Sequence, residues 1–379
     1  MKIFRIKSYI IFLGIIITKS FGQVYIQEII EGCSNSSTMY VSSAYQGNDL
    51  YVAYRGPDHE LSITKVDLAT FTVNEIFDNI NSGIFGDVTS DAVGNVNISI
   101  YDDYLYIVYK GYNDNYRPIK IIKLDKNTMS VLNSNTLVDG LRANRIRADR
   151  NDNTLYISYL TEWEYNTSIL KVDLNTISLV NNNVYSFTYG SDIIVRSNNI
   201  YIPYNTTSPT SFRLKKINAN GLNEIGDIEI YGGTTNNGST VVSAAADNNI
   251  LTLSYYNSYG FNLAKVDLQN WTLSENIILD EEQNGYIDQL VYDGNTYIFP
   301  TTEISDSTGI SKINHNDFSN FETYMQQNID PAHVSFINNN NIGYLSFWNW
   351  NNSGYLSIAK VLLKYIGPTW YVSTVGSDE

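Results

Sequence analysis

Seven aromatic residues lie in polar connecting segments of this chain, where their rings are expected to be accessible. An aromatic face stacks on the C–H groups of a sugar, while neighbouring polar side chains fix its hydroxyl groups. Residues 162–165 and 348–352 combine Trp or Tyr with Glu or Asn in this way. The alternative is that the rings pack against neighbouring loops. The candidate ligand-binding residues are Tyr112, Tyr116, Trp163, Tyr165, Tyr259, Trp348 and Trp350.

Two histidines, His59 and His333, are candidate general bases. A histidine beside Arg55 could abstract a proton from a uronate whose charge the guanidinium neutralises, which is the chemistry of a polysaccharide lyase. The alternative is that both are ordinary surface histidines.

Paired carboxylates could instead hydrolyse a glycosidic bond. The chain has 39 acidic residues, so close pairs are expected by accident, and we name no catalytic residue. The pairs in predicted loops are Asp58 with Glu60, Glu162 with Glu164, and Glu303 with Asp306.

A basic cluster stands out in this acidic chain: Arg142, Arg145, Arg147 and Arg150. Strand alternation would put Arg145 and Arg147 on one face of a strand, where they could line a central channel and bind an anion. The alternative is ion pairing with acidic neighbours such as Asp149.

Signals for metal binding are weak. Residues 280–285 open like a calcium loop, but the twelfth position is Val291, where an EF-hand has a bidentate glutamate. We therefore expect no cofactor, and a looser calcium site is the alternative.

Charge and cysteine count exclude several classes of protein. The 379 residues include 24 basic and 39 acidic side chains, a net charge of −15 that repels nucleic acid and anionic lipid. A single cysteine, Cys33, cannot form an internal disulfide, and 43% apolar residues are enough for a large core.

The elements that would position these residues are strands, because one apolar strand recurs seven times. Its third residue is always aliphatic and its fourth usually small, as in a strand buried on both faces. Asn-, Asp- and Gly-rich turns precede each copy, and no long helical periodicity occurs outside the N-terminal segment. The copies begin at Leu50, Leu105, Leu155, Ile200, Leu251, Thr296 and Gly343.

A second strand follows each copy and is marked by a lysine. The spacings between these lysines are 58, 48, 45, 49, 47 and 48 residues, so the two markers share one register. The lysines are Lys65, Lys123, Lys171, Lys216, Lys265, Lys312 and Lys360.

Seven units of about 49 residues, each long enough for four strands, predict an all-β, seven-bladed β-propeller of four-stranded antiparallel blades. The sequence is similar to seven-bladed propellers of secreted bacterial proteins in general, without a sub-family signature. The seventh unit ends after its third strand. We therefore expect residues 24–30 to supply the outer strand of blade seven and close the ring. The resemblance implies ligand binding near the central channel, on the rim formed by the loops that follow each second strand.

The two ends of the chain differ from the repeats. Residues 1–22 have a basic start, an apolar run of about 10 residues and a small-residue cleavage site, which predicts a signal peptide rather than a membrane span of ~20 residues. Cleavage would leave 20 basic and 39 acidic residues, a net charge of −19. After a propeller over residues 23–366, residues 367–379 form a linker. Within this segment, residues 369–379 have an aromatic-Tyr-Val-Ser strand and a Gly-Ser-Asp turn, and they resemble the start of a right-handed parallel β-helix domain, which suggests a longer natural chain. The alternative is a strand that pairs back onto the main domain.

These observations predict a secreted or cell-surface binding or adhesion module for glycans, with no catalysis of its own. We expect a monomeric domain within a longer chain, with a glycan or an extracellular protein as partner, no nucleic acid and no membrane insertion. The alternatives are a polysaccharide lyase or glycoside hydrolase that uses the same rim, and a protein-interaction scaffold.

Overall fold

The computed structural model describes most of the chain between Tyr25 and Leu363. The described residues are 25–35, 39–56, 60–80, 95–111, 117–139, 143–161, 166–188, 192–207, 210–232, 243–247, 249–257, 260–280, 287–300, 307–314, 318, 322–327, 331–349 and 352–363.

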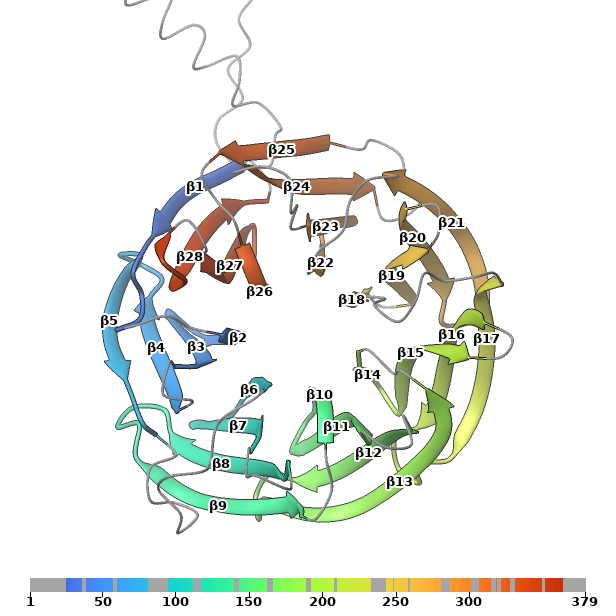
Figure 1. The fold of residues 1–379 in the computed structure, drawn as a ribbon, viewed down its shortest axis with the longest axis horizontal. Coiled ribbons are helices and arrows are strands. Elements are labelled where there is room, and N and C mark those ends of the chain that lie inside the picture. The colour runs from blue at the N-terminus through green and yellow to red at the C-terminus, as the bar shows by residue number, and fades with distance from the viewer. Residues whose placement is uncertain are drawn as a thin grey trace, which may run out of the picture.

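Within these residues the strands form seven antiparallel four-stranded sheets arranged radially as the blades of a β-propeller (Figure 1). The sequence of the first unit predicts strands at about residues 38–45, 50–55, 61–68 and 71–77, and the four strands of that blade agree with these bounds to within one residue at each end. Blades one to three are β2 (Met39–Gln46), β3 (Asp49–Arg55), β4 (Leu61–Asp67) and β5 (Thr72–Phe77); β6 (Val96–Tyr101), β7 (Tyr104–Lys110), β8 (Ile119–Asp125) and β9 (Val131–Val138); and β10 (Ala143–Asn151), β11 (Thr154–Thr161), β12 (Asn166–Asp173) and β13 (Ser178–Thr188).

The remaining four blades follow the same order from the central axis outward. They are β14 (Ile194–Arg196), β15 (Asn199–Thr207), β16 (Thr210–Asn218) and β17 (Glu224–Gly232); β18 (Ser243–Asp247), β19 (Ile250–Asn257), β20 (Gly260–Asp267) and β21 (Thr272–Asp280); β22 (Ile287–Tyr292), β23 (Asn295–Pro300), β24 (Ser307–Asn314) and β25 (Glu322–Gln327); and β26 (Pro331–Asn339), β27 (Ile342–Asn349) and β28 (Tyr355–Leu362) with β1 (Tyr25–Ile30).

The N-terminal strand β1 pairs antiparallel with β28, so the fourth strand of blade seven comes from the opposite end of the sequence (Figure 1). This is the position expected for residues 24–30. The interface between blades seven and one is as apolar as the others, with Leu50, Val52 and Tyr54 against Leu356 and Ile358. The pairing hides the edge of β28 and joins the two ends of the ring.

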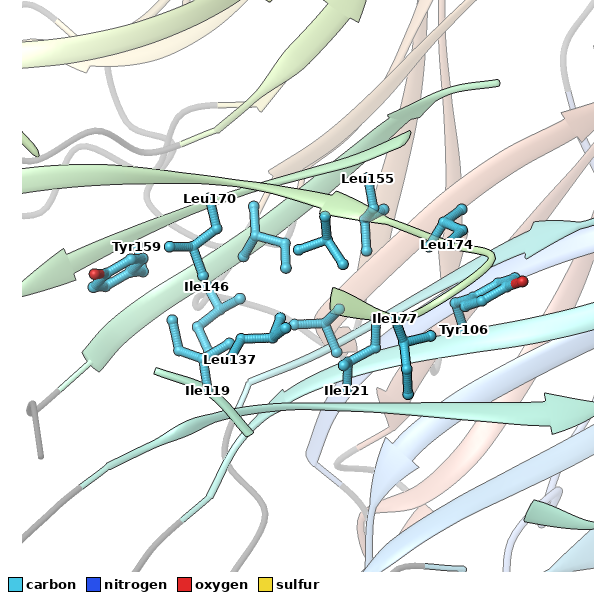
Figure 2. Packing of buried hydrophobic residues seen from close by; sticks show 13 residues of the cluster. Tyr106, Ile119, Ile121, Leu137, Ile146, Leu155, Tyr159, Leu170, Leu174 and Ile177 are labelled. Atoms are coloured by element: carbon cyan, nitrogen blue, oxygen red, sulfur yellow. The ribbon is translucent and has the colours of Figure 1, made fainter. Parts of the chain in front are cut away.

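The core lies between blades rather than within one of them. Between blades two and three, Ile119, Ile121 and Leu137 face Ile146 and Leu170, all buried (Figure 2). Burying such side chains contributes ~1.5–3 kcal/mol each. Because strands of the second position are covered on both faces, their five marker residues are apolar or small throughout.

The repeated lysine has a structural role. In six blades it lies directly across the sheet from the aromatic second residue of the marker strand, as in the pairs Tyr51–Lys65 and Tyr156–Lys171. Lys65 Nζ lies 5.4 Å from the centre of the Tyr51 ring, and Lys171 Nζ 5.9 Å from that of Tyr156. These cation–π contacts are worth about 0.5–1 kcal/mol each at exposed sites.

The same tyrosines also connect neighbouring blades. Tyr51 donates a hydrogen bond to the Lys126 carbonyl (3.2 Å), Tyr156 to that of Ala219 (3.1 Å) and Tyr297 to that of Leu363 (2.9 Å). Each acceptor belongs to the next blade around the ring. The motif that made the repeat visible therefore holds the blades together.

Among the described residues, no helix is both long enough and apolar enough to cross a membrane.

Candidate functional site

Three of the innermost strands carry a bulge at the same register position. Pairing shifts between Met39 and Ser42 in β2, between Asn144 and Arg147 in β10, and between Ala332 and Ser335 in β26. Bulges bend a strand and re-aim side chains, and they occur next to active sites. These three shifts lie at the ends of the strands where the chain enters each blade.

The bulges of blades one and seven hold Tyr40 and His333 in the left-handed backbone region, with φ of 52° and 49°. Bulky residues rarely adopt this conformation, which costs of order 1–3 kcal/mol. The strain places the two rings side by side, with centroids 4.8 Å apart.

Two further side chains extend this contact. The Arg55 guanidinium lies 5.6 Å from the centre of the Tyr40 ring, and His333 stacks on Trp348 with centroids 5.7 Å apart. The order is thus arginine, tyrosine, histidine and tryptophan across the junction of blades one and seven. Tyr40, Arg55 and His333 are partly exposed, and Trp348 is 7% exposed.

The environment of His333 keeps its imidazole neutral. Burial, followed by the charges of Arg147 and Arg55, lowers the pKa of His333 to about 4. Two positive charges near one imidazole disfavour its protonated form, as does removal from water.

Arg147 brings blade three into the same region. Its charge acts on His333 of blade seven, on Asp192 of blade four and on Asp288 of blade six. Arg147 therefore faces the axis, around which the inner strands are arranged (Figure 1). We call Tyr40, Arg55, Arg147, Asp192, Asp288, His333 and Trp348 the axial cluster.

The two aspartates of the axial cluster hold neighbouring blades together. Asp288 accepts hydrogen bonds from the Phe336 N–H (2.6 Å), the Ser243 hydroxyl (3.1 Å) and the Gln289 N–H (2.9 Å). Asp192 accepts from the N–H groups of Ala244 (3.0 Å) and Ile193 (2.9 Å). Each carboxylate thus satisfies backbone donors of the next inner strand, which would otherwise lie buried and unpaired.

Burial raises the pKa of Asp192 to about 7 and that of Asp288 to about 6, against the lowering effect of Arg147 and the N–H donors. The Asp288 charge raises the pKa of Asp192 further. Near neutral pH these carboxyl groups are incompletely ionised, so they cancel the charge of Arg147 only in part.

Similar bonds join other inner strands. The Val195 N–H donates to Asp149 (2.7 Å), the Ile98 N–H to Ser42 (3.2 Å) and the Ser43 N–H to Ser335 (3.0 Å). A side chain of one blade that binds the backbone of the next is therefore a general feature around the axis, and Asp192 and Asp288 are its examples in blades four and six.

Of the seven aromatic residues predicted to bind ligand, Trp348 lies in the described part of the chain. Its ring is covered rather than accessible, because it packs against His333. The other six, Tyr112, Tyr116, Trp163, Tyr165, Tyr259 and Trp350, lie outside the described residues, as do His59 and both members of the pairs Glu162–Glu164 and Glu303–Asp306.

The predicted neighbours Arg55 and His333 do come together, although 278 positions separate them in the sequence. The bulge in β10 lies between Asn144 and Arg147. The Arg145 side chain lies outside the described part of the chain, so its place on the same face as Arg147 stays a prediction. Arg150 lies over the ring of Tyr101, with 5.4 Å between guanidinium and ring centre.

Sequence reasoning missed Tyr40, Asp192 and Asp288. Each lies at or just before the start of an innermost strand, in a stretch that carries no repeat marker. The repeat period gives the position at which each innermost strand begins, so the sequence could have marked these positions as candidates. The bulge at Tyr40 and the partner strands of the two aspartates could not be marked in this way, since those contacts cross from blade to blade.

In the described part of the chain, no three His, Cys, Asp or Glu side chains are grouped so that they could hold a metal ion. Residues 281–286 of the calcium-like segment lie outside that part.

Solved structures with a similar fold are found for this chain. The chain is similar to the crystal structure of the computationally designed Ika8 protein, with a TM-score of 0.52 and 10% sequence identity, over 86% of this chain and 96% of that chain. At this identity the similarity concerns the fold alone. No family model and no curated protein matches the sequence. A β-propeller fits a binding or interaction module, in which the site rather than the fold decides the ligand.

Proposed function

We propose that this protein is a secreted or cell-surface module that binds glycans at the axial cluster. The observation behind this proposal is the pair of partly exposed rings, Tyr40 and His333, held by bulges beside Arg55 and Arg147. Rings beside groups that donate hydrogen bonds provide the stacking and the polar contacts that a sugar needs.

Strained backbone at Tyr40 and His333 supports a ligand role over a purely structural one. A propeller closes without it, because four of its seven inner strands pair regularly with their neighbours. Strain of this kind persists mainly where it positions groups for function. Export is supported by the sequence of residues 1–22 and remains part of the proposal.

The test is a glycan array probed with the protein and three variants. His333→Asn removes one ring at a position where asparagine tolerates the left-handed backbone. Tyr40→Ala removes the other ring. Tyr45→Ala, an exposed tyrosine near the far end of the same strand, is the matched control. We expect His333→Asn and Tyr40→Ala to bind the glycan at least tenfold more weakly than the wild type. Tyr45→Ala should bind it as tightly as the wild type. Equal binding by all four proteins, or no glycan bound by any, would contradict the proposal.

A carbohydrate-active enzyme at the same place is the second candidate. The neutral imidazole of His333 favours it, since a neutral base next to two arginines could abstract a proton beside a uronate carboxylate. A pKa of about 4 makes it a weak base, which favours binding over catalysis. Elimination from a uronate polymer creates an unsaturated product that absorbs in the ultraviolet. Its appearance with this protein and absence with His333→Asn would establish the enzyme.

A further inference from the structure

Arg147 differs from other arginines in what its guanidinium contacts. Arg150 donates to the Asp152 carbonyl (2.7 Å) and lies over the Tyr101 ring. Arg213 forms ion pairs with Asp227 (3.1 Å) and Glu229 (3.0 Å), and Arg196 lies 3.7 Å from Asp149. Among the described residues, Arg147 makes a single side-chain hydrogen bond, which Nη1 donates to the Ile146 carbonyl (3.1 Å). In a chain with a net charge of −15, the exposed Arg147 has no ion pair with any of the described residues.

The nearby carboxylates do not occupy this guanidinium. Asp192 and Asp288 act on it through space, but their oxygens accept backbone N–H groups of neighbouring blades. Within the described part of the chain, one of the five guanidinium donors of Arg147 is therefore engaged, by the Ile146 carbonyl. A planar guanidinium with free donors is suited to bidentate binding of a carboxylate.

Apolar and positive groups lie next to each other here. The rings of Tyr40 and His333 are 4.8 Å apart, and the Arg55 guanidinium lies 5.6 Å from the centre of the Tyr40 ring. Arg147 ends the bulge of β10, at the same register position as the bulges that hold the two rings. A saccharide with a carboxylate has the complementary pair of features, a ring with C–H faces and a planar anion attached to it.

We propose that the axial cluster selects saccharides that carry a carboxylate, which Arg147 receives while the sugar ring lies on Tyr40 and His333. This inference rests on the proposed function and names its ligand class.

The charge of the whole molecule sets a limit on that ligand. A net charge of −15 repels a densely charged polymer, while Arg147 and Arg55 attract one anion over the short distance that salt does not screen. The ligand is therefore an isolated acidic residue, at a chain end or between neutral sugars, rather than a polyuronate.

Calorimetric titration of the protein with methyl β-glucuronide, methyl β-glucoside and the glucuronide methyl ester tests the inference. The last two lack the charge but keep the ring. We expect the glucuronide to bind at least tenfold more tightly than either. Arg147→Met should abolish this preference for the glucuronide over the glucoside, and Arg147→Lys should restore part of it. Arg150→Met, on the same strand, is the control for removal of an arginine.

Each other outcome has a separate meaning. Equal binding of glucuronide and glucoside would overturn the inference and leave the proposed function standing. If none of the three sugars binds at millimolar concentration and the glycan array is also negative, the proposed function fails with it. Acetate that binds as well as the glucuronide would refute the role of the sugar ring. Affinity that rises with each added uronate in an oligomer would refute the limit to one carboxylate.

Discussion

At the scale of single residues, the axial cluster combines groups whose ionisation the fold has changed. His333 is neutral because it is withdrawn from water and faces two guanidinium groups. Cys33 is equally controlled by burial, which raises the pKa of its thiol to about 12 and makes it unreactive. The sequence located Arg55, Arg147 and His333 as candidates. It could not provide their state of charge, which depends on contacts between blades.

The titration of His333 checks this description. We expect its imidazole to protonate with a pKa of about 4, well below the usual 6.5. The contribution of His333 to the free energy of unfolding is therefore fully present above pH 6.5 and is lost as the pH falls toward 4. The reason is that the unfolded chain binds the proton at a higher pH than the folded protein does. NMR of the ring nitrogens, assigned with His333→Asn, measures it.

Arg147→Met provides the control for the cause of this shift. Removal of one positive charge should raise the pKa of His333 measurably in the same spectra. A pKa of His333 near 6.5 in the wild type, or one that Arg147→Met leaves unchanged, would show that the His333 and Arg147 side chains do not lie near each other.

At the scale of elements, the inner strands are held in place by side chains that bind the backbone of the next blade. Asp192 joins β14 to β18 in this way, and Asp288 joins β22 to β26. The strands themselves could be predicted, since a marker with seven copies specifies both their period and their burial. The bulges could not, because one extra residue in β2, β10 or β26 leaves no trace in the hydrophobic pattern.

Asp192 makes stability depend on pH in an unusual direction. Its pKa is raised from 3.8 to about 7, so the folded protein binds this proton more readily than the unfolded chain. The contribution of Asp192 to stability is therefore greatest below pH 4 and falls as the pH rises toward 7. Asp192→Asn keeps an oxygen for the Ala244 N–H and removes the charge. We expect the variant to gain about 2–4 kcal/mol in free energy of unfolding relative to wild type between pH 4 and pH 8.

Denaturant unfolding of both proteins at several pH values measures this difference. Asp152→Asn, in an exposed turn with a left-handed backbone, is the control and should follow the wild type. A difference between Asp192→Asn and wild type that is constant with pH, or that has the opposite sign, would show that Asp192 is an ordinary ionised surface carboxylate.

At the scale of the whole molecule, the ring depends on pairing between the two ends of the chain. Blade number, blade order and the N-terminal closing strand could all be predicted from the spacing of two markers and the missing strand of the seventh unit. The axial cluster as a whole could not be predicted, because its members come from blades one, three, four, six and seven. Only the closed ring brings them together.

A point substitution in β1 tests ring closure. Ile29 is half-buried against the core between blades six and seven, whereas Glu28 beside it is exposed. We expect Ile29→Asn to lower the free energy of unfolding by about 1–3 kcal/mol and to promote association through the loosened edge of β28. Glu28→Gln should change neither. Thermal unfolding with light scattering measures both effects, and equal behaviour of the two variants would show that β1 does not close the ring.

The most direct test of the binding site is a crystal structure of the protein soaked with methyl β-glucuronide. We expect the sugar ring on Tyr40 and His333 and its carboxylate within hydrogen-bond distance of the Arg147 guanidinium. A sugar bound on the outer strands with the axial cluster unoccupied at saturating concentration would contradict this account.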